Sequence, residues 1–192
     1  MALKTSLKSN EKSISKQIAF SAIFSALCCV STLSLTVPLP ASGYFNAGDV
    51  FVLLSGWFLG PLFGSLSAGI GSALADIISG YVVYAPVTFV VKFTVALSSY
   101  LLWKVFKPFI KKEPLDFIPR VLAGIIGETI MVAGYFAFES ILYGVIGAVP
   151  NLLGNALQGV CCLVLATLLC SALRPIKVIR SYFPLLELNA VK

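Results

Sequence analysis

The sequence lacks residues and motifs on which much enzyme chemistry depends. Its 192 residues include no histidine, which excludes a zinc-protease HExxH helix, a Ser-His or Cys-His catalytic pair and histidine ligation of haem or metal. No glycine is followed by lysine, so the GxxxxGK[ST] loop that binds nucleotide phosphates is absent too. We therefore expect the chain not to be an enzyme, and any ATP-driven work to depend on a partner protein.

Charged residues are scarce. They make up 11% of the chain, against 58% hydrophobic residues, and the mean hydropathy is +0.97. A soluble domain has roughly a quarter charged residues, and a small one has too much surface for its volume to hide so much apolar area. The composition therefore indicates a membrane protein.

The cysteines and the N-terminus have simple interpretations. All five cysteines lie in apolar runs without CxxC spacing, so we interpret them as small packing residues and expect no metal site. The basic, serine-rich N-terminus precedes an apolar stretch that no small-x-small cleavage site closes. That stretch is predicted to be a retained first span and not a removed signal peptide.

Six apolar segments, separated by breaks that contain proline or glycine, predict an all-α polytopic membrane protein with six transmembrane helices. They cover residues 16–36, 48–60, 62–79, 85–106, 118–143 and 150–173. The second segment rises only about 20 Å against a hydrocarbon layer of about 30 Å, so segments two and three are a tilted pair or a re-entrant hairpin. Nine of the twelve residues from 64 to 75 are Gly, Ala or Ser, which indicates a central helix and favours six spans.

Basic residues gather on one side of this topology. Thirteen of the fourteen lie in the N-terminal tail, the connection after the fourth segment or the C-terminal region. Cytoplasmic loops are enriched in Lys and Arg, so both termini are predicted to be cytoplasmic and the loops at 37–47, 79–85 and 144–150 to face outward. Nucleic acid is not an expected partner, because the basic residues share no folded face and are not interleaved with aromatics.

The same assignment divides the chain into three parts. They are a cytoplasmic basic tail (1–15), a transmembrane substrate-binding domain (16–173) and a cytoplasmic C-terminal tail (174–192). No internal repeat or separate soluble domain is found.

Polar side chains within the apolar segments point to a site, because a charge near mid-bilayer costs at least about 2.5 kcal/mol. The ionisable ones are Asp49, Asp76, Lys92, Glu128 and Glu139. All but Glu128 fall in the predicted outer leaflet, together with three amides: Asn151, Asn155 and Gln158.

Helical phase places these residues in stripes. At 100° per residue, single helix faces hold Tyr84, Thr88 and Lys92; Glu128, Tyr135 and Glu139; and the three amides. The stripes are either interhelical hydrogen bonds or the walls of a site, and their concentration in one leaflet favours a site. Asp76 either caps the turn that follows it or lines that site.

Several motifs, taken in order, resemble a known family. They are Tyr44-Phe-Asn-Ala-Gly-Asp49, Gly60-Pro61, Gly69-Ile-Gly71-Ser-Ala-Leu-Ala-Asp76, Gly80-Tyr-Val-Val-Tyr-Ala-Pro86, Gly127-Glu128, Met131-Val-Ala-Gly-Tyr135, Pro150-Asn151 and Gln158-Gly159. Together they resemble the substrate-binding S components of energy-coupling factor (ECF) transporters. The likeness is greatest to the riboflavin-type branch, which includes hydroxymethylpyrimidine, pyridoxine and pantothenate proteins. It covers residues 16–173.

The resemblance implies a vitamin-capture subunit of the bacterial plasma membrane. Such a subunit binds its ligand from outside and docks on a transmembrane T subunit driven by two cytoplasmic ABC ATPases, so ATP is used by the partners and no cofactor is bound by this chain. Small residues of the first helix contact the T subunit in that family. This implies a docking role for Ala19, Ala22 and Ala26, where spacing alone indicates only a possible helix contact.

The expected cavity lies in the outer leaflet under the loop from Val37 to Ala47. Tyr84, Tyr135 and Trp57 suit a flat heteroaromatic ring, although Trp57 also suits packing. In the empty state, Lys92 and Glu139 are expected either to neutralise each other partly or to hold ordered water. The predicted ligand-binding residues are Asn46, Asp49, Tyr84, Lys92, Tyr135, Glu139, Asn151, Asn155 and Gln158.

Alternatives remain open at this point. A self-sufficient ion-coupled secondary transporter would use an acidic relay that reaches both leaflets, and only Glu128 is deep. A membrane enzyme with Glu128 and Glu139 as acid and base would lack a nucleophile or metal. Pyridoxine and hydroxymethylpyrimidine are the favoured ligands, with riboflavin and pantothenate as further options.

Overall fold

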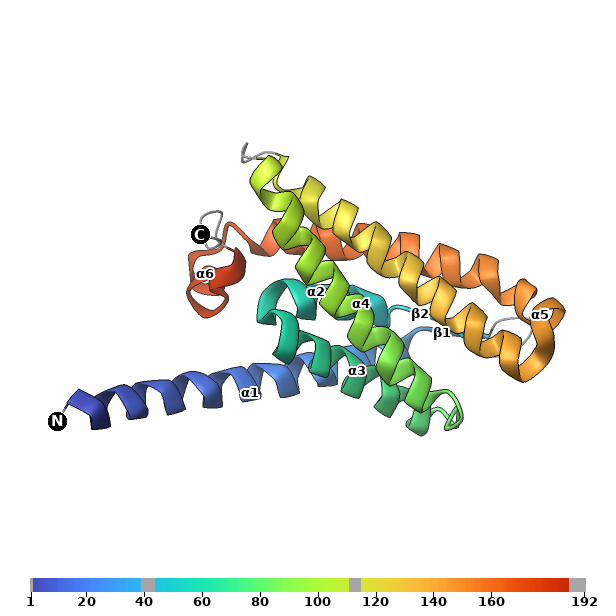
Figure 1. The fold of residues 1–192 in the computed structure, drawn as a ribbon, viewed down its shortest axis with the longest axis horizontal. Helices are drawn as coiled ribbons and strands as arrows, with labels where there is room; N and C mark the ends of the chain where they lie inside the picture. Colours follow the sequence, from blue (N-terminus) through green and yellow to red (C-terminus); the bar gives the residue numbers. More distant parts are fainter. Residues whose placement is uncertain (1, 39–43, 111–114, 187–192) are drawn as a thin grey trace.

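The computed structural model describes residues 2–38, 44–110 and 115–186, which form a bundle of helices with one small β-ribbon (Figure 1). The helices are α1 (Ala2–Ser34), α2 (Gly48–Leu59), α3 (Pro61–Ile78), α4 (Ala85–Phe106), α5 (Phe117–Leu173) and α6 (Lys177–Tyr182), with 3-10 turns η1 (Lys107–Phe109) and η3 (Pro184–Leu186). The predicted helical fold class is confirmed.

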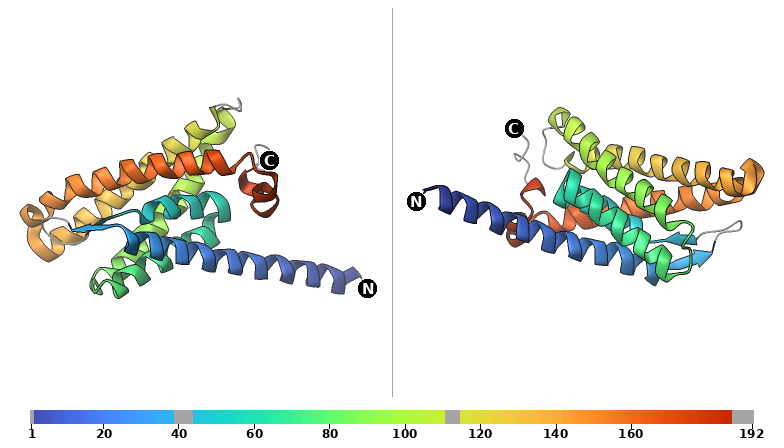
Figure 2. Two further views of the ribbon diagram at one scale, coloured as in Figure 1. Left: turned by 180° about the vertical axis from the view of Figure 1, so that it is seen from behind. Right: turned by 60° about the horizontal axis from the view of Figure 1, so that its bottom comes forward.

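α5 is a hairpin of two helical arms. Gly144, with φ 76° and ψ 158°, adopts a conformation that a residue without a side chain reaches easily. The chain reverses there (Figures 1 and 2), and Gly159 lies against Glu128. We call residues 117–143 the first arm and 145–173 the second arm. Pro150 lies inside the helical second arm. The sequence predicted a break at this proline, but the chain reverses earlier, at Gly144.

α3 packs closely against its neighbours, as its small residues predict. A Cβ atom on Gly71 would collide with the Ser25 carbonyl of α1. A Cβ atom on Gly69 would lie 2.9 Å from the carbonyl oxygen of Phe89 in α4. Small residues thus let α1 and α4 approach two sides of the same helix.

α2 is too short to cross a membrane as a straight helix. Its 12 residues rise about 18 Å, and Trp57 within it is fully buried in the core. Within the described ranges, four helices are long and apolar enough to span a membrane, with α5 counted once, and α2 is not one of them. The number of six crossings therefore stays a prediction.

The predicted outer loop contains a β-ribbon. β1 (Thr36–Pro38) pairs antiparallel with β2 (Tyr44–Asn46); residues 39–43 of the expected roof lie outside the described residues. The sequence indicated only a loop, because three-residue strands are too short to show an alternating pattern. The ribbon matters for function because β2 carries two side chains into the site described below.

The predicted C-terminal tail is folded as far as Leu186. The Phe183 ring lies 4.8 Å from the Phe20 ring and 5.2 Å from the Phe58 ring, and Leu186 is buried. α1 continues without a break through the predicted N-terminal tail. The start of α1 and α6 lie at the same end of the molecule (Figures 1 and 2), and the cytoplasmic location of that end stays a prediction.

Candidate ligand-binding site

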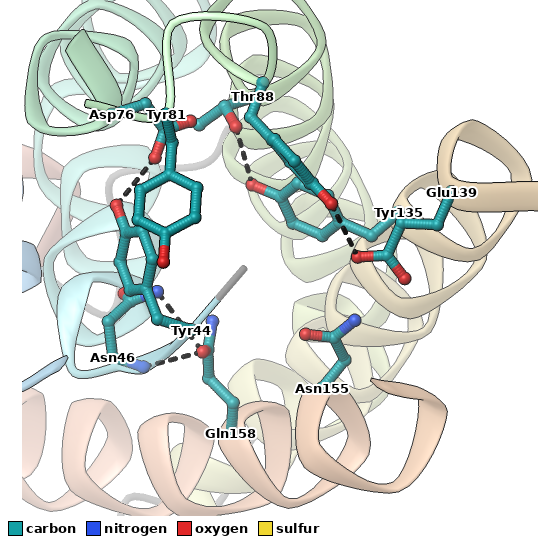
Figure 3. A pocket seen from close by; sticks show the side chains of 10 residues that line it. Tyr44, Asn46, Asp76, Tyr81, Thr88, Tyr135, Glu139, Asn155 and Gln158 are labelled. Atoms are coloured by element: carbon teal, nitrogen blue, oxygen red, sulfur yellow. Dashed lines mark hydrogen bonds between the residues drawn. The ribbon is translucent and has the colours of Figure 1, made fainter. Parts of the chain in front are cut away.

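A cavity lies at the end of the bundle away from α6, between β2, the turn from α3 to α4 and both arms of α5 (Figures 1 and 3). The space in it that a water molecule can enter is about 30 Å³, which is room for a few water molecules at most, so a ligand of vitamin size requires the lining side chains to move apart. We call this cavity the tyrosine cavity. Its lining residues are Tyr44, Asn46, Asp76, Tyr81, Tyr84, Thr88, Tyr135, Glu139, Asn155 and Gln158.

Tyrosine rings form much of the wall. The Tyr44 and Tyr81 rings are 5.0 Å apart, with their planes inclined by 55°, and the Tyr81 and Tyr84 rings meet edge to face at 6.1 Å. The Tyr135 hydroxyl lies 3.0 Å from the Thr88 hydroxyl. Aromatic walls with hydroxyl groups at their ends suit a flat ligand that carries polar substituents.

Asp76 lines the cavity. Of the two roles that the sequence left open for it, turn cap or wall of the site, the structure supports the second. The Tyr44 hydroxyl donates to Asp76 Oδ1 at 2.6 Å. Oδ2 has no hydrogen bond of ordinary geometry within the described residues, although the Thr88 hydroxyl interacts with this carboxylate. Burial, together with the hydrogen bond to Asp76, raises the pKa of Tyr44 above its ordinary value. Tyr44 therefore remains a donor to the carboxylate.

Glu139 has a similar arrangement on the first arm. Asn151 Nδ2 donates to Glu139 Oε1 at 2.9 Å, and the Tyr84 hydroxyl lies 3.5 Å from the same oxygen. Among the residues placed by the structure, nothing hydrogen-bonds Oε2. Each carboxylate thus has one oxygen engaged by the protein and one left over.

A buried ion pair adjoins the cavity. Lys92 Nζ lies 2.6 Å and 2.8 Å from the two Asp49 oxygens, and Gln158 Nε2 donates to Asp49 Oδ2 at 2.6 Å. The Asn46 backbone N–H donates to Gln158 Oε1 at 2.8 Å, which links the pair to the cavity wall. The expected pairing of Lys92 with Glu139 is wrong. Helical phase gives the face of α4 but not the neighbour of that face, which is α2.

The predicted site residues divide into two groups. Six of the nine line the cavity: Asn46, Tyr84, Tyr135, Glu139, Asn155 and Gln158. The other three stand behind it, because Asp49 and Lys92 pair with each other and Asn151 donates to Glu139. Contact with a ligand stays a prediction for all nine.

Glu128 and Trp57 lie away from the tyrosine cavity. Glu128 lines an apolar groove between the two arms of α5 with Ile125, Val132 and Val160, and neither carboxylate oxygen has a hydrogen-bond partner in the described part of the chain. Trp57 belongs to the core. The structure therefore supports a packing role for Trp57 and not contact with a ligand in the cavity.

Sequence reasoning missed two lining residues: Tyr44 in strand β2, before α2, and Tyr81 in the turn that follows α3. Both belong to the motifs that carry the family resemblance, and this was the available signal. Thr88 was placed on the right helix face but not among the binding residues. Helical phase says nothing about residues in turns, because they follow no regular period.

The first helix presents the residues predicted to dock on a partner. Ala19, Ala22 and Ala26 are exposed. Ala22 and Ala26 line a shallow apolar groove between α1 and α3, together with Leu66 and Ile70 of α3. The structure therefore leaves this face accessible.

Known proteins share most of this chain. A protein-family model described as "ECF-type riboflavin transporter, S component" matches residues 12–175. A curated protein of Pyrococcus woesei, described as "Uncharacterized protein in gap 3'region", is 36% identical over 132 residues, which are 68% of this chain and 83% of that protein. The family match spans the cavity, α1 from residue 12 onward and all of α5.

Proposed function

The chain belongs to the family of ECF-type riboflavin transporter S components, and we propose that it captures a small vitamin or vitamin precursor for an ATP-driven importer. Family membership identifies a vitamin-type substrate-binding subunit of a membrane transporter. The particular ligand and the coupling to a partner complex are the new parts of this proposal.

The observation that supports capture is a cavity at one end of the bundle that polar side chains line. Its polar groups come from β2, α3, α4 and both arms of α5. Interhelical hydrogen bonds that serve only stability would satisfy their donors and acceptors. Here Glu139 Oε2 has no hydrogen-bond partner in the described ranges, and neither Asp76 nor Glu139 is in an ion pair. Asp116, outside the cavity, also keeps one free oxygen but is paired with two arginines. Unused hydrogen-bonding capacity in a cavity suits a ligand site.

The energy for transport is proposed to come from partner subunits. The sequence contains no nucleotide-binding loop, so concentrative uptake requires ATPases in other chains, joined through a transmembrane T subunit. The exposed groove at Ala22 and Ala26 is the proposed T-subunit surface. Small residues let another helix approach closely there.

Reconstitution tests the division of labour. The purified chain should bind a vitamin in calorimetric titration, show no ATPase activity, and accumulate no vitamin in liposomes on its own. Accumulation should appear when the T subunit and both ATPases are added with ATP. Concentrative uptake by the chain alone, driven by a proton or sodium gradient, would instead identify a secondary transporter.

A double substitution tests docking. Ala22→Leu with Ala26→Leu should weaken capture of the T subunit in a pull-down and leave vitamin affinity nearly unchanged, because added volume blocks close backbone approach. The matched control is Ala133→Leu with Ala137→Leu, an exposed pair of the same spacing on the first arm. Equal pull-down by the two variants would exclude α1 as the docking surface.

A further inference from the structure

The tyrosine cavity holds two buried carboxylates, and in each of them the protein hydrogen-bonds mainly one of the two oxygens. Asp76 is 5% exposed and Glu139 is 2% exposed. Glu139 Oε2 has no hydrogen-bond partner within the residues that the structure describes. Asp76 Oδ2 has none of ordinary geometry there either, although the Thr88 hydroxyl interacts with the Asp76 carboxylate. Figure 3 shows Asp76 beside Tyr44 and Glu139 on the other side of the cavity. The two walls therefore present unused acceptors to the same space.

In the part of the chain that the structure describes, no cation forms an ion pair with either carboxylate, and Lys92 acts on Asp76 only from a greater distance. The sequence has one basic residue, Lys92, between Lys16 and Lys104, and none between Arg120 and Arg174. Lys92 lies 2.6 Å and 2.8 Å from the two oxygens of Asp49, which take up its charge. Residues 39–43, Leu-Pro-Ala-Ser-Gly, carry no charged side chain. The parts of the chain that build the cavity thus contain an excess of carboxyl groups.

An excess of carboxylates discriminates between ligands by charge. A ligand that carries a carboxylate or phosphate would add a like charge in a site of low dielectric and would leave both free oxygens without donors. A ligand with a protonated nitrogen or amino groups would donate to those oxygens through charge-assisted hydrogen bonds.

The tyrosines favour the same chemistry. The rings of Tyr44, Tyr81 and Tyr84 are neighbours, with centroids 5.0 Å and 6.1 Å apart. The electron-rich face of an aromatic ring attracts a cation as well as stacking on a flat heterocycle. Lys92 Nζ already lies 5.2 Å from the Tyr135 ring, so a cation is found on an aromatic ring next to this cavity.

We propose that the tyrosine cavity selects a small nitrogen heterocycle that is cationic or bears amino groups, with donors directed at Asp76 Oδ2 and Glu139 Oε2. It rejects anionic vitamins such as pantothenate, and phosphorylated compounds. This inference rests on the proposed capture function and narrows its substrate. It separates ligands by charge, which neither the fold nor the family match does.

Calorimetric titration of the purified wild-type chain with ligands matched in ring and different in charge tests the inference. One series is an aminopyrimidine bearing an aminomethyl, hydroxymethyl or carboxylate group. The other is pyridoxamine, pyridoxine and pyridoxic acid, with riboflavin and pantothenate added. In the ring series that binds, we expect affinity to fall from amine to alcohol to carboxylate, with about 30-fold or more between the extremes.

Each outcome of this panel decides something. Pantothenate or a carboxylate as the tightest ligand would overturn the inference and leave the capture function intact. If riboflavin binds most tightly and its affinity is unchanged in the variants described below, the inference is also overturned and the capture function is kept. Failure of every compound to bind would reject the capture function, and the inference with it. Because the charge series uses wild-type protein, it decides the question whether or not a variant folds.

Two variants locate the selectivity. Asp76→Asn and Glu139→Gln keep shape and remove charge, so each should weaken the amine by about 10- to 100-fold and leave the carboxylate unchanged or improved. Glu11→Gln is the control, since it removes a carboxyl residue from the start of α1, which projects away from the cavity (Figure 1). If a variant with a normal melting temperature binds the amine, the alcohol and the carboxylate equally more weakly, the carboxylates shape the cavity but do not select ligands by charge.

Discussion

Two groups of buried charged residues lie toward opposite ends of the bundle and differ in how their charges are paired. We call the first the Asp116 cluster. Asp116 Oδ2 lies 2.6 Å from Arg120 Nη1 and 2.8 Å from Arg174 Nη1. The Trp103 ring has the charged groups of Lys107 and Arg120 at 4.8 Å and 5.3 Å from its centroid. Every charged residue of this cluster has an opposite charge or an aromatic ring beside it.

The tyrosine cavity has the opposite arrangement. Asp76 and Glu139 form no ion pair within the described residues. Asp116 also keeps one oxygen, Oδ1, without a hydrogen-bond partner there, so the difference between the two groups is the paired cation and not the free oxygen. The single lysine of that region is taken by Asp49. Charges paired within the protein hold helices in register, whereas unpaired ones are costly in the empty protein and favour any ligand that satisfies them. The comparison thus separates a structural cluster from a binding site on physical grounds.

Substitution of Lys92 should lower stability more than the other changes below, because it leaves the buried charge of Asp49 without its partner. Lys92→Met leaves the Asp49 carboxylate fully buried without its cation, and breaking such a pair costs about 3–5 kcal/mol. For a chain of this length the melting temperature in detergent should fall by roughly 10 °C. Lys92→Met with Asp49→Leu should recover most of the loss. A normal melting temperature with lost vitamin affinity would instead place Lys92 in contact with the ligand.

Substitution of Asp116 should come next. Asp116→Asn removes the charge shared by Arg120 and Arg174, and we expect a loss of about 2–3 kcal/mol. The effect is smaller than at Lys92, because the Arg174 side chain is 19% exposed and reaches solvent. Vitamin affinity should stay within about twofold of wild type, since the cluster is remote from the cavity. A changed affinity at an unchanged melting temperature would contradict the structural role of the cluster.

Asn151 offers a sharper test on the cavity side. It donates to Glu139 Oε1 at 2.9 Å and does not line the cavity. Asn151→Ala should therefore weaken ligand binding indirectly, by about 1 kcal/mol or roughly fivefold, through the orientation of Glu139. In the Glu139→Gln background the same substitution should add little. Titration of the single and double variants measures the coupling, and additive losses would mean that Asn151 acts on the ligand by itself.

Substitution of Glu128 should have the smallest effect. The carboxyl group lies between the arms of α5, outside the tyrosine cavity, and has no hydrogen-bond partner in the described ranges. Glu128→Gln should therefore change stability by less than about 1 kcal/mol and leave vitamin affinity unchanged. A large loss of affinity, measured by the same titration, would extend the binding site into the groove between the arms.

The sequence by itself determined the class of protein and most of its helices. Scarce charge and long apolar runs are local properties, so they indicate membrane helices whatever the neighbours are. The small residues of α3 predicted its close contacts. The predicted loop at 144–150 contains the reversal of α5 at Gly144, but residues 145–150 are helical, so the break expected at Gly147 to Pro150 is wrong. Helical phase also assigned six of the cavity-lining residues correctly to a shared polar region.

Only the tertiary structure decided which of these polar residues meet. Lys92 pairs with Asp49 and not with Glu139, Asn151 stands behind Glu139, and Tyr44 reaches Asp76 from a ribbon that has no sequence signature. A helical period gives the face on which a side chain lies but not the rotation of the helix against its neighbours. That rotation is set by the packing of the whole bundle. It therefore also decides which charged side chains are paired within the protein and which remain available to a ligand.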